Sequence, residues 1–137
     1  MIMGFFSKLS KKALENAQEI EDELNRLRNK TNAEIISIIG TGGRLKGLPL
    51  IYVCRDEIEL KKFTARLPEI IPSINNISED RNLRDILINY DDSILFFKQI
   101  MPNVSFFAVY PNKGDILTIK KWIYNKLESL KEILHDY

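Results

Sequence analysis

The sequence predicts an α+β domain, a five-stranded antiparallel sheet with flanking helices in the order α-β-β-α-β-β-β-α. Apolar β-branched runs at 35–39 and 51–54 flank a glycine-rich stretch, which is typical of a β-hairpin with a long tip. Three more strand-like runs follow with such short links that they must run antiparallel. These runs are Asp85 to Tyr90, Ser93 to Ile100 and Val104 to Tyr110. Helical periodicity precedes, separates and follows the two strand blocks.

The leading helix is predicted over Phe6 to Arg28, where apolar residues recur every three or four positions. The apolar stripe of this helix spans too few heptads for a stable coiled coil on its own, so we expect the helix to pack on the sheet. We expect residues 1–14 to be an N-terminal extension of this helix and residues 15–137 to form a single domain. The apolar stripe consists of Phe6, Leu9, Ala13, Ala17, Ile20, Leu24 and Leu27.

The middle and closing helices are each predicted to begin at an aspartate N-cap, Asp56 and Asp115. Pro68 and Pro72 interrupt the middle pattern, because proline lacks an amide proton and crowds the preceding turn. We therefore expect one helix to about Leu67, followed by a kink or a separate short helix. The apolar face of the closing helix consists of Ile116, Ile119, Ile123, Leu127, Leu130 and Leu134.

Composition limits the classes of function. The chain has 137 residues, 45% hydrophobic and 28% charged, with 20 basic residues against 19 acidic and a net charge of +1. With nearly balanced charges the protein has no overall positive potential to attract nucleic-acid phosphates, so we expect no nucleic-acid partner. A single cysteine, Cys54, excludes an internal disulfide and suits a small buried hydrophobe. No apolar run approaches the roughly 20 residues that span a bilayer, and we expect a cytoplasmic protein.

Catalytic chemistry finds little support in the sequence. Gly42 and Gly47 have the spacing of a phosphate-binding loop, but Leu48 and Pro49 stand where lysine and a hydroxyl residue are needed. The chain has one histidine, His135, and one cysteine, which is too few for a typical metal cluster. We therefore expect no catalytic residues, no metal site and no cofactor.

Adjacent aromatic residues run along the second strand block, and each adjacent pair puts one ring on each face of the sheet. Both faces must then be covered, and we expect helices on one face and a partner on the other. Base stacking by these rings would need interleaved basic residues, and Lys98 stands nearly alone. The aromatic residues are Phe96, Phe97, Phe106, Phe107 and Tyr110.

Several local motifs, in this order of elements, resemble the Roadblock family, the dynein light chain type of domain. Gly47-Leu48-Pro49-Leu50 matches the family's turn into its second strand, and the run from Ile86 to Asp92 is similar to its third strand and acidic turn. Residues 105–123 are similar to the last strand entering the closing helix. The resemblance covers about residues 15–134 and departs from the family at the two prolines.

This resemblance implies a non-catalytic, dimeric regulator or scaffold for a small Ras-like GTPase. Roadblock domains pair through the middle helix and the third strand, so that one sheet continues across both subunits. An edge strand with apolar faces needs such a partner. The interface residues implied here are Phe63, Leu67, Ile86, Leu87, Ile88 and Tyr90.

Two other classes stay open. One is a small-molecule-sensing domain of profilin- or PAS-like architecture, with a pocket lined by Phe96, Phe106 and Ile123. The other is an enzyme of unrecognised type.

Two segments outside the strands also suggest roles. Phe5, Phe6 and Leu9 with nearby lysines form an amphipathic turn suited to an anionic membrane surface, although packing on a neighbouring chain is favoured. Arg44 is the only arginine on the hairpin tip, and we interpret it as a surface residue rather than a donated catalytic finger.

Overall fold

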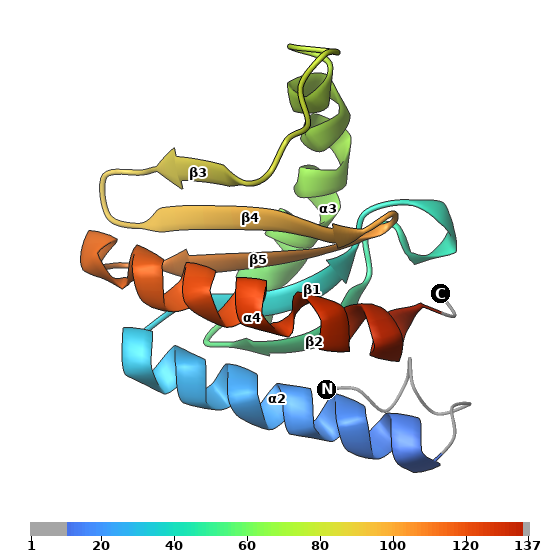
Figure 1. The fold of residues 1–137 in the computed structure, drawn as a ribbon. Coiled ribbons are helices and arrows are strands. Elements are labelled where there is room, and N and C mark those ends of the chain that lie inside the picture. Colours follow the sequence, from blue (N-terminus) through green and yellow to red (C-terminus); the bar gives the residue numbers. More distant parts are fainter. Residues whose placement is uncertain (1–10, 136–137) are drawn as a thin grey trace.

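The computed structural model describes residues 11–135 and confirms the predicted order of elements (Figure 1). The predicted start of the leading helix and the amphipathic turn of Phe5, Phe6 and Leu9 fall within residues 1–10, which lie outside the described part. The helices are α2 (Lys11–Thr31), α3 (Glu57–Asn75) and α4 (Ile116–Leu134), with 3-10 turns η1 (Gly43–Leu45) and η2 (Lys113–Asp115). The strands are β1 (Ile35–Gly40), β2 (Pro49–Cys54), β3 (Ile86–Asn89), β4 (Ile94–Met101) and β5 (Val104–Tyr110).

The five strands form one antiparallel sheet in the order β2-β1-β5-β4-β3. The first hairpin and the later meander join through β1 and β5, where Ile38 stands opposite Phe106. This central pair is distant in sequence and nearly wholly buried. The least buried strand, β3, forms one edge.

Helices cover both faces of the sheet within the one chain. α2 and α4 lie on one face and α3 crosses the other (Figure 1). The aromatic residues divide accordingly: Phe96, Phe106 and Tyr110 pack under α2 and α4, while Phe97 and Phe107 pack under α3. The expectation that a partner covers one whole face is therefore wrong, because α3 supplies that layer.

The hairpin tip uses glycine as the sequence predicts. Gly43 and Gly47 have φ of +60° and +82°, a region that side chains rarely adopt. Gly40 is needed for space instead, because a Cβ there would lie 1.8 Å from the backbone oxygen of Leu45. An ion pair of 3.1 Å between Lys46 and Glu69 links this tip to α3.

α3 is one helix through Asn75, so the predicted alternative of a separate short helix after Leu67 is wrong, and the alternative of a kink stays a prediction. Asp56 caps the helix as expected, and its carboxylate accepts a 2.9 Å hydrogen bond from the N–H of Ile58. Pro68 and Pro72 both lie inside this helix, where each lacks an N–H for the backbone hydrogen bond and crowds the preceding turn. The buried side chains of Leu67 and Ile71 keep the helix on the sheet past the first proline. The end of α3 then projects beyond the β3 edge (Figure 1).

Asp115 occupies the N-cap position of α4 as predicted, but its side chain makes no capping hydrogen bond within the described chain. Instead the Asn112 side chain accepts a 2.9 Å hydrogen bond from the N–H of Gly114 and caps η2. The 3-10 turn η2 thus leads directly into α4. Cys54 is only half-buried, beside the core under α3, so it is less buried than expected.

Candidate interaction surface at the sheet edge

β3 presents an open backbone edge. It pairs with β4 on one side, and nothing in residues 11–135 pairs with its other side. Unpaired strand edges are templates for another chain. The opposite edge strand, β2, begins with Pro49, which has no N–H to donate.

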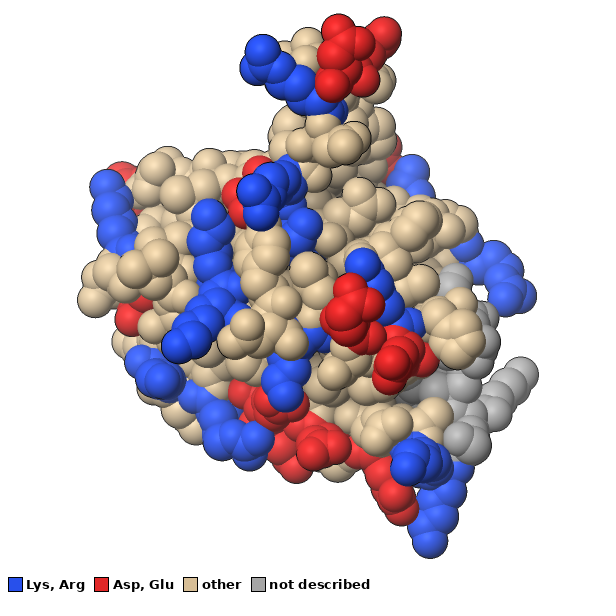
Figure 2. Space-filling model, in the orientation of Figure 1, with Lys and Arg blue, Asp and Glu red and all other residues tan. Residues whose placement is uncertain are grey.

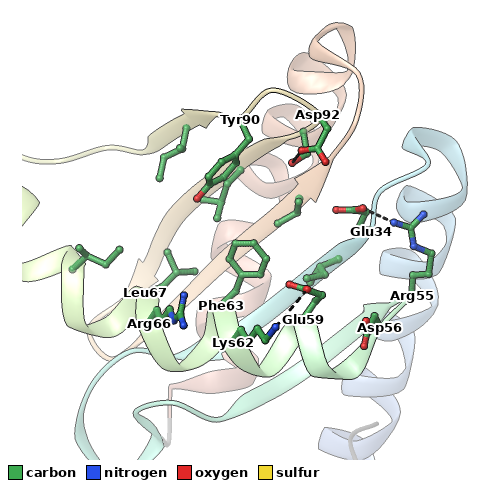
Figure 3. A pocket seen from close by; sticks show the side chains of 16 residues that line it. Glu34, Arg55, Asp56, Glu59, Lys62, Phe63, Arg66, Leu67, Tyr90 and Asp92 are labelled. Atoms are coloured by element: carbon green, nitrogen blue, oxygen red, sulfur yellow. Dashed lines mark hydrogen bonds and ion pairs between the residues drawn. The ribbon is translucent and has the colours of Figure 1, made fainter.

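A groove of about 730 Å³ lies beside this edge, between α3 and the sheet (Figure 3). Its apolar lining comes from three sources: α3, the end of β3, and the strands that form the floor. These residues are Phe63, Leu67 and Ile70 from α3, Ile88 and Tyr90 from the β3 side, and Ile35, Leu95 and Val109 from the floor. We call this surface the α3–β3 groove.

The depth of the α3–β3 groove is set by packing against the core below it. The Phe63 ring contacts Phe107, with centroids 5.8 Å apart, and Leu67 is 3% exposed. Towards the rim, Ile70 and Tyr90 are 46% and 48% exposed. The groove therefore has a buried floor and exposed large apolar side chains at its rim, which is typical of an interaction surface.

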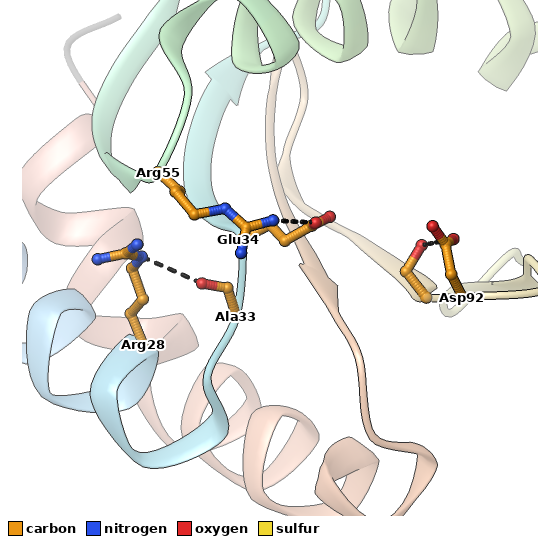
Figure 4. A network of polar contacts seen from close by, with 6 residues as sticks. Arg28, Ala33, Glu34, Arg55 and Asp92 are labelled. Carbon is orange, nitrogen blue, oxygen red and sulfur yellow. Dashed lines mark hydrogen bonds and ion pairs between the residues drawn. The ribbon is translucent and has the colours of Figure 1, made fainter.

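The rim of this groove carries both signs of charge. Glu34 forms an ion pair with Arg55 (Figure 4), and Lys62 lies 3.8 Å from Glu59 on α3. Nearby, the hydroxyl of Tyr52 donates to Glu57 at 3.3 Å, and burial together with that carboxylate raises the pKa of Tyr52. A rim of this kind favours no single ligand charge. It resembles the polar border of a protein interface.

Four of the six predicted interface residues line the groove: Phe63, Leu67, Ile88 and Tyr90. Ile86 packs on the core under α3, and Leu87 points to the opposite face, where it is 48% exposed. The alternation of a strand accounts for this division. The charged rim on α3 was not predicted from the sequence, although Glu59, Lys62 and Arg66 recur at helical spacing beside the apolar stripe.

The pocket proposed for a small molecule is filled by protein. Phe96, Phe106 and Ile123 are each 0% exposed. The Phe106 ring contacts Phe96 and Trp122, with centroids 6.3 Å and 5.7 Å apart. These three side chains belong to one packed core cluster under α2 and α4.

Residues 11–135 contain no group of three His, Cys, Asp or Glu side chains placed to hold a metal ion. In the same range, no helix is both long and apolar enough to cross a membrane. Cys54 ends β2, and burial raises the pKa of its thiol. His135 follows the last turn of α4, with Nδ1 at 2.9 Å from the Glu132 carbonyl oxygen.

The five-stranded antiparallel sheet, with two helices on one face and the middle helix on the other, is a Roadblock-like arrangement. Comparison with solved structures agrees: this chain has the Roadblock fold. A structure described as MglB with tetrameric arrangement matches at a TM-score of 0.74 and 13% identity, covering 93% of this chain and 94% of that one.

Two further structures share the fold. MglB, a gliding protein from Thermus thermophilus, matches with a TM-score of 0.70 and 14% identity over 94% of this chain and 96% of its own. A Roadblock/LC7 domain from Streptomyces avermitilis matches with a TM-score of 0.68 and 12% identity over 82% and 94%. Neither a family model nor a curated protein matches the sequence.

Proposed function

We propose that the protein is a cytoplasmic homodimer that regulates or scaffolds a small Ras-like GTPase and has no active site of its own. One observation supports the dimer above all: an unpaired strand edge and an exposed apolar groove lie on the same side of the molecule. The Roadblock fold supports the GTPase as partner.

In the proposed dimer, β3 pairs antiparallel with its copy about a two-fold axis, and the sheet continues into the partner. The end of α3 projects past β3 (Figure 1) and would then overlie the α3–β3 groove of the partner. Two exposed apolar side chains, Ile70 on α3 at 46% and Ile77 just beyond the end of α3 at 81%, are suited to that contact. Pairing would thus cover the edge and the groove together.

The dimer is tested by Ile70→Asp, because a carboxylate on this exposed groove wall should disrupt the interface without entering the monomer core. The matched control is Ile58→Asp, on the same helix, 67% exposed and outside the groove. Light scattering should give twice the 16.0 kDa chain mass for the native protein and the control, and a monomer for Ile70→Asp. A native monomer at micromolar concentration, or a dimeric Ile70→Asp protein, would refute the interface.

The GTPase role is tested with the purified dimer and small GTPases from the same cell, loaded with GTP or GDP. The proposal expects binding that depends on the nucleotide, and no GTP hydrolysis by the dimer alone. Equal binding to both forms of every GTPase, or none, would contradict it. Hydrolysis by the dimer alone would show an active site.

A further inference from the structure

A second hollow lies on the other face of the β3 edge, between α4 and the residues that lead into β3. It has a volume of about 460 Å³ and is lined by Arg84, Asp85, Lys120 and Tyr124. The Tyr124 hydroxyl donates a 2.8 Å hydrogen bond to the Asp85 carboxylate, and Lys120 Nζ lies 3.6 Å from the same oxygen. These contacts fix the entry to β3 against α4, so the hollow has a defined wall on each side.

Positive charge dominates this hollow. The ammonium of Lys98, on the neighbouring β4, lies 5.1 Å from the centroid of the Tyr124 ring. Arg84, Lys98 and Lys120 therefore surround the single carboxylate of Asp85. Burial lowers the pKa of Lys98, which means that its charged form is incompletely solvated. Figure 2 shows basic side chains gathered over β3 and the first part of α4, with acidic ones over α2 and over the later part of α4.

Apolar side chains accompany the charges. Leu87 points to this face from β3, and Leu117 lies on α4 at helical spacing from Lys120 and Tyr124. Their exposed fractions are 48% and 74%. We define the β3–α4 groove as Arg84, Asp85, Leu87, Lys98, Lys120 and Tyr124. It offers cations and a leucine side by side, which neither a purely polar nor a purely apolar ligand would satisfy.

We propose that the β3–α4 groove docks an acidic, amphipathic segment of a partner protein. Carboxylates of the segment would meet Arg84, Lys98 and Lys120, and its apolar side chains would cover Leu87. The inference rests on the proposed dimer for the full extent of this binding surface. Pairing of β3 with its copy sets two such grooves side by side, and together they form one basic trough between the two α4 helices.

The acidic stretch of α2 on the same face argues for a protein segment over a membrane. Glu15, Glu19 and Asp22 are exposed there, and they would repel a wide anionic surface that reached both helices. A single peptide segment is narrow enough to follow the groove and avoid them. Covering Leu87 also requires apolar side chains, which a sugar–phosphate backbone lacks.

The test is selection of random 16-residue peptides displayed on phage against the immobilised native dimer, followed by anisotropy measurements. We expect enriched peptides to combine several Asp or Glu residues with Leu, Ile or Phe. Their affinity should fall with added salt, and about tenfold or more with Arg84→Glu or Lys120→Glu. The matched control Lys61→Glu, on exposed α3, should bind as the native protein does. Circular dichroism confirms that each variant is folded.

Other results would overturn the proposal. These are no enrichment, enrichment of neutral or basic peptides, or acidic peptides that bind both groove variants unchanged. Binding to phosphatidylserine vesicles that is lost with Arg84→Glu would assign the groove to membranes instead. Light scattering on the same samples separates this inference from the dimer. A dimer that selects no acidic peptide refutes the groove alone, whereas a monomer that binds such peptides through Arg84 refutes the dimer alone.

Discussion

Tyr110 gives a direct test of the packing under α2 and α4. Its ring is fully buried in that core, and its hydroxyl has no hydrogen-bond partner among the described residues. An unpaired buried hydroxyl costs about 1–3 kcal/mol. Tyr110→Phe removes this cost and keeps the ring, so we expect the free energy of unfolding at pH 7 to rise by about 1 kcal/mol. For a chain of this length the melting temperature should rise by about 2–4 °C.

The same residue sets a pH dependence. Burial raises the pKa of Tyr110 from 10.0 to about 12. Between these values the unfolded chain releases the proton while the folded chain keeps it, so native stability falls as pH rises. The folded protein therefore loses about 2–3 kcal/mol of stability between pH 10 and pH 12, and this loss has not begun below pH 10. Tyr110→Phe should remove this part of the alkaline decline.

Urea denaturation at pH 7 and through pH 10–12 measures both effects. The matched control is Tyr124→Phe, which removes the hydrogen bond to Asp85 and should lower stability at pH 7 by about 1–2 kcal/mol. If Tyr110→Phe also lowers stability at pH 7, its hydroxyl has a partner in solution and the packing argument is wrong. An unchanged alkaline slope would show that burial does not hold the proton on Tyr110.

Three further sets of variants address local geometry. Asp56→Ala should lower the free energy of unfolding by about 1 kcal/mol, because a capping hydrogen bond is lost, and Asp115→Ala by less; equal losses in urea denaturation would contradict the assigned caps. Gly40→Ala should prevent folding at 37 °C through its 1.8 Å clash, while Gly47→Ala, at φ +82° with nothing within 4 Å, should cost only about 1 kcal/mol. Arg44→Ala should leave GTPase binding and any stimulation of hydrolysis intact, and a loss of stimulation by orders of magnitude with unchanged binding would show that the tip is catalytic.

Local patterns were enough to predict the elements but not the sheet. The glycine-rich tip and the short links in the second block define the hairpin and the meander, because turns depend on nearby residues. The pairing of Ile35 with Val109 joins segments far apart in the chain, and no local signal specifies it. Helix ends were less predictable. Burial of Ile71 maintains α3 beyond Pro68, and that burial depends on the sheet beneath.

The interface prediction was limited in the same way. Helical spacing brings Phe63 and Leu67 to one face, and strand alternation separates Ile88 from Leu87. Which strand face lies under α3 depends on the whole sheet, so the sequence placed all β3 residues in one interface. The β3–α4 groove depends on Lys98 and Tyr124, which meet only after folding.

The unequal covering of the sheet has a consequence for local unfolding. One face is held by two helices that also contact each other, and the other by α3 alone. A layer with a smaller core detaches at a lower free energy than the whole domain. Amide protons of α3 should therefore exchange with solvent before those of β1 and β5, which stay shielded until the sheet itself opens. A partner bound on α3 would slow exchange in that helix first, so deuterium uptake there reports occupancy of the α3–β3 groove without any mutation.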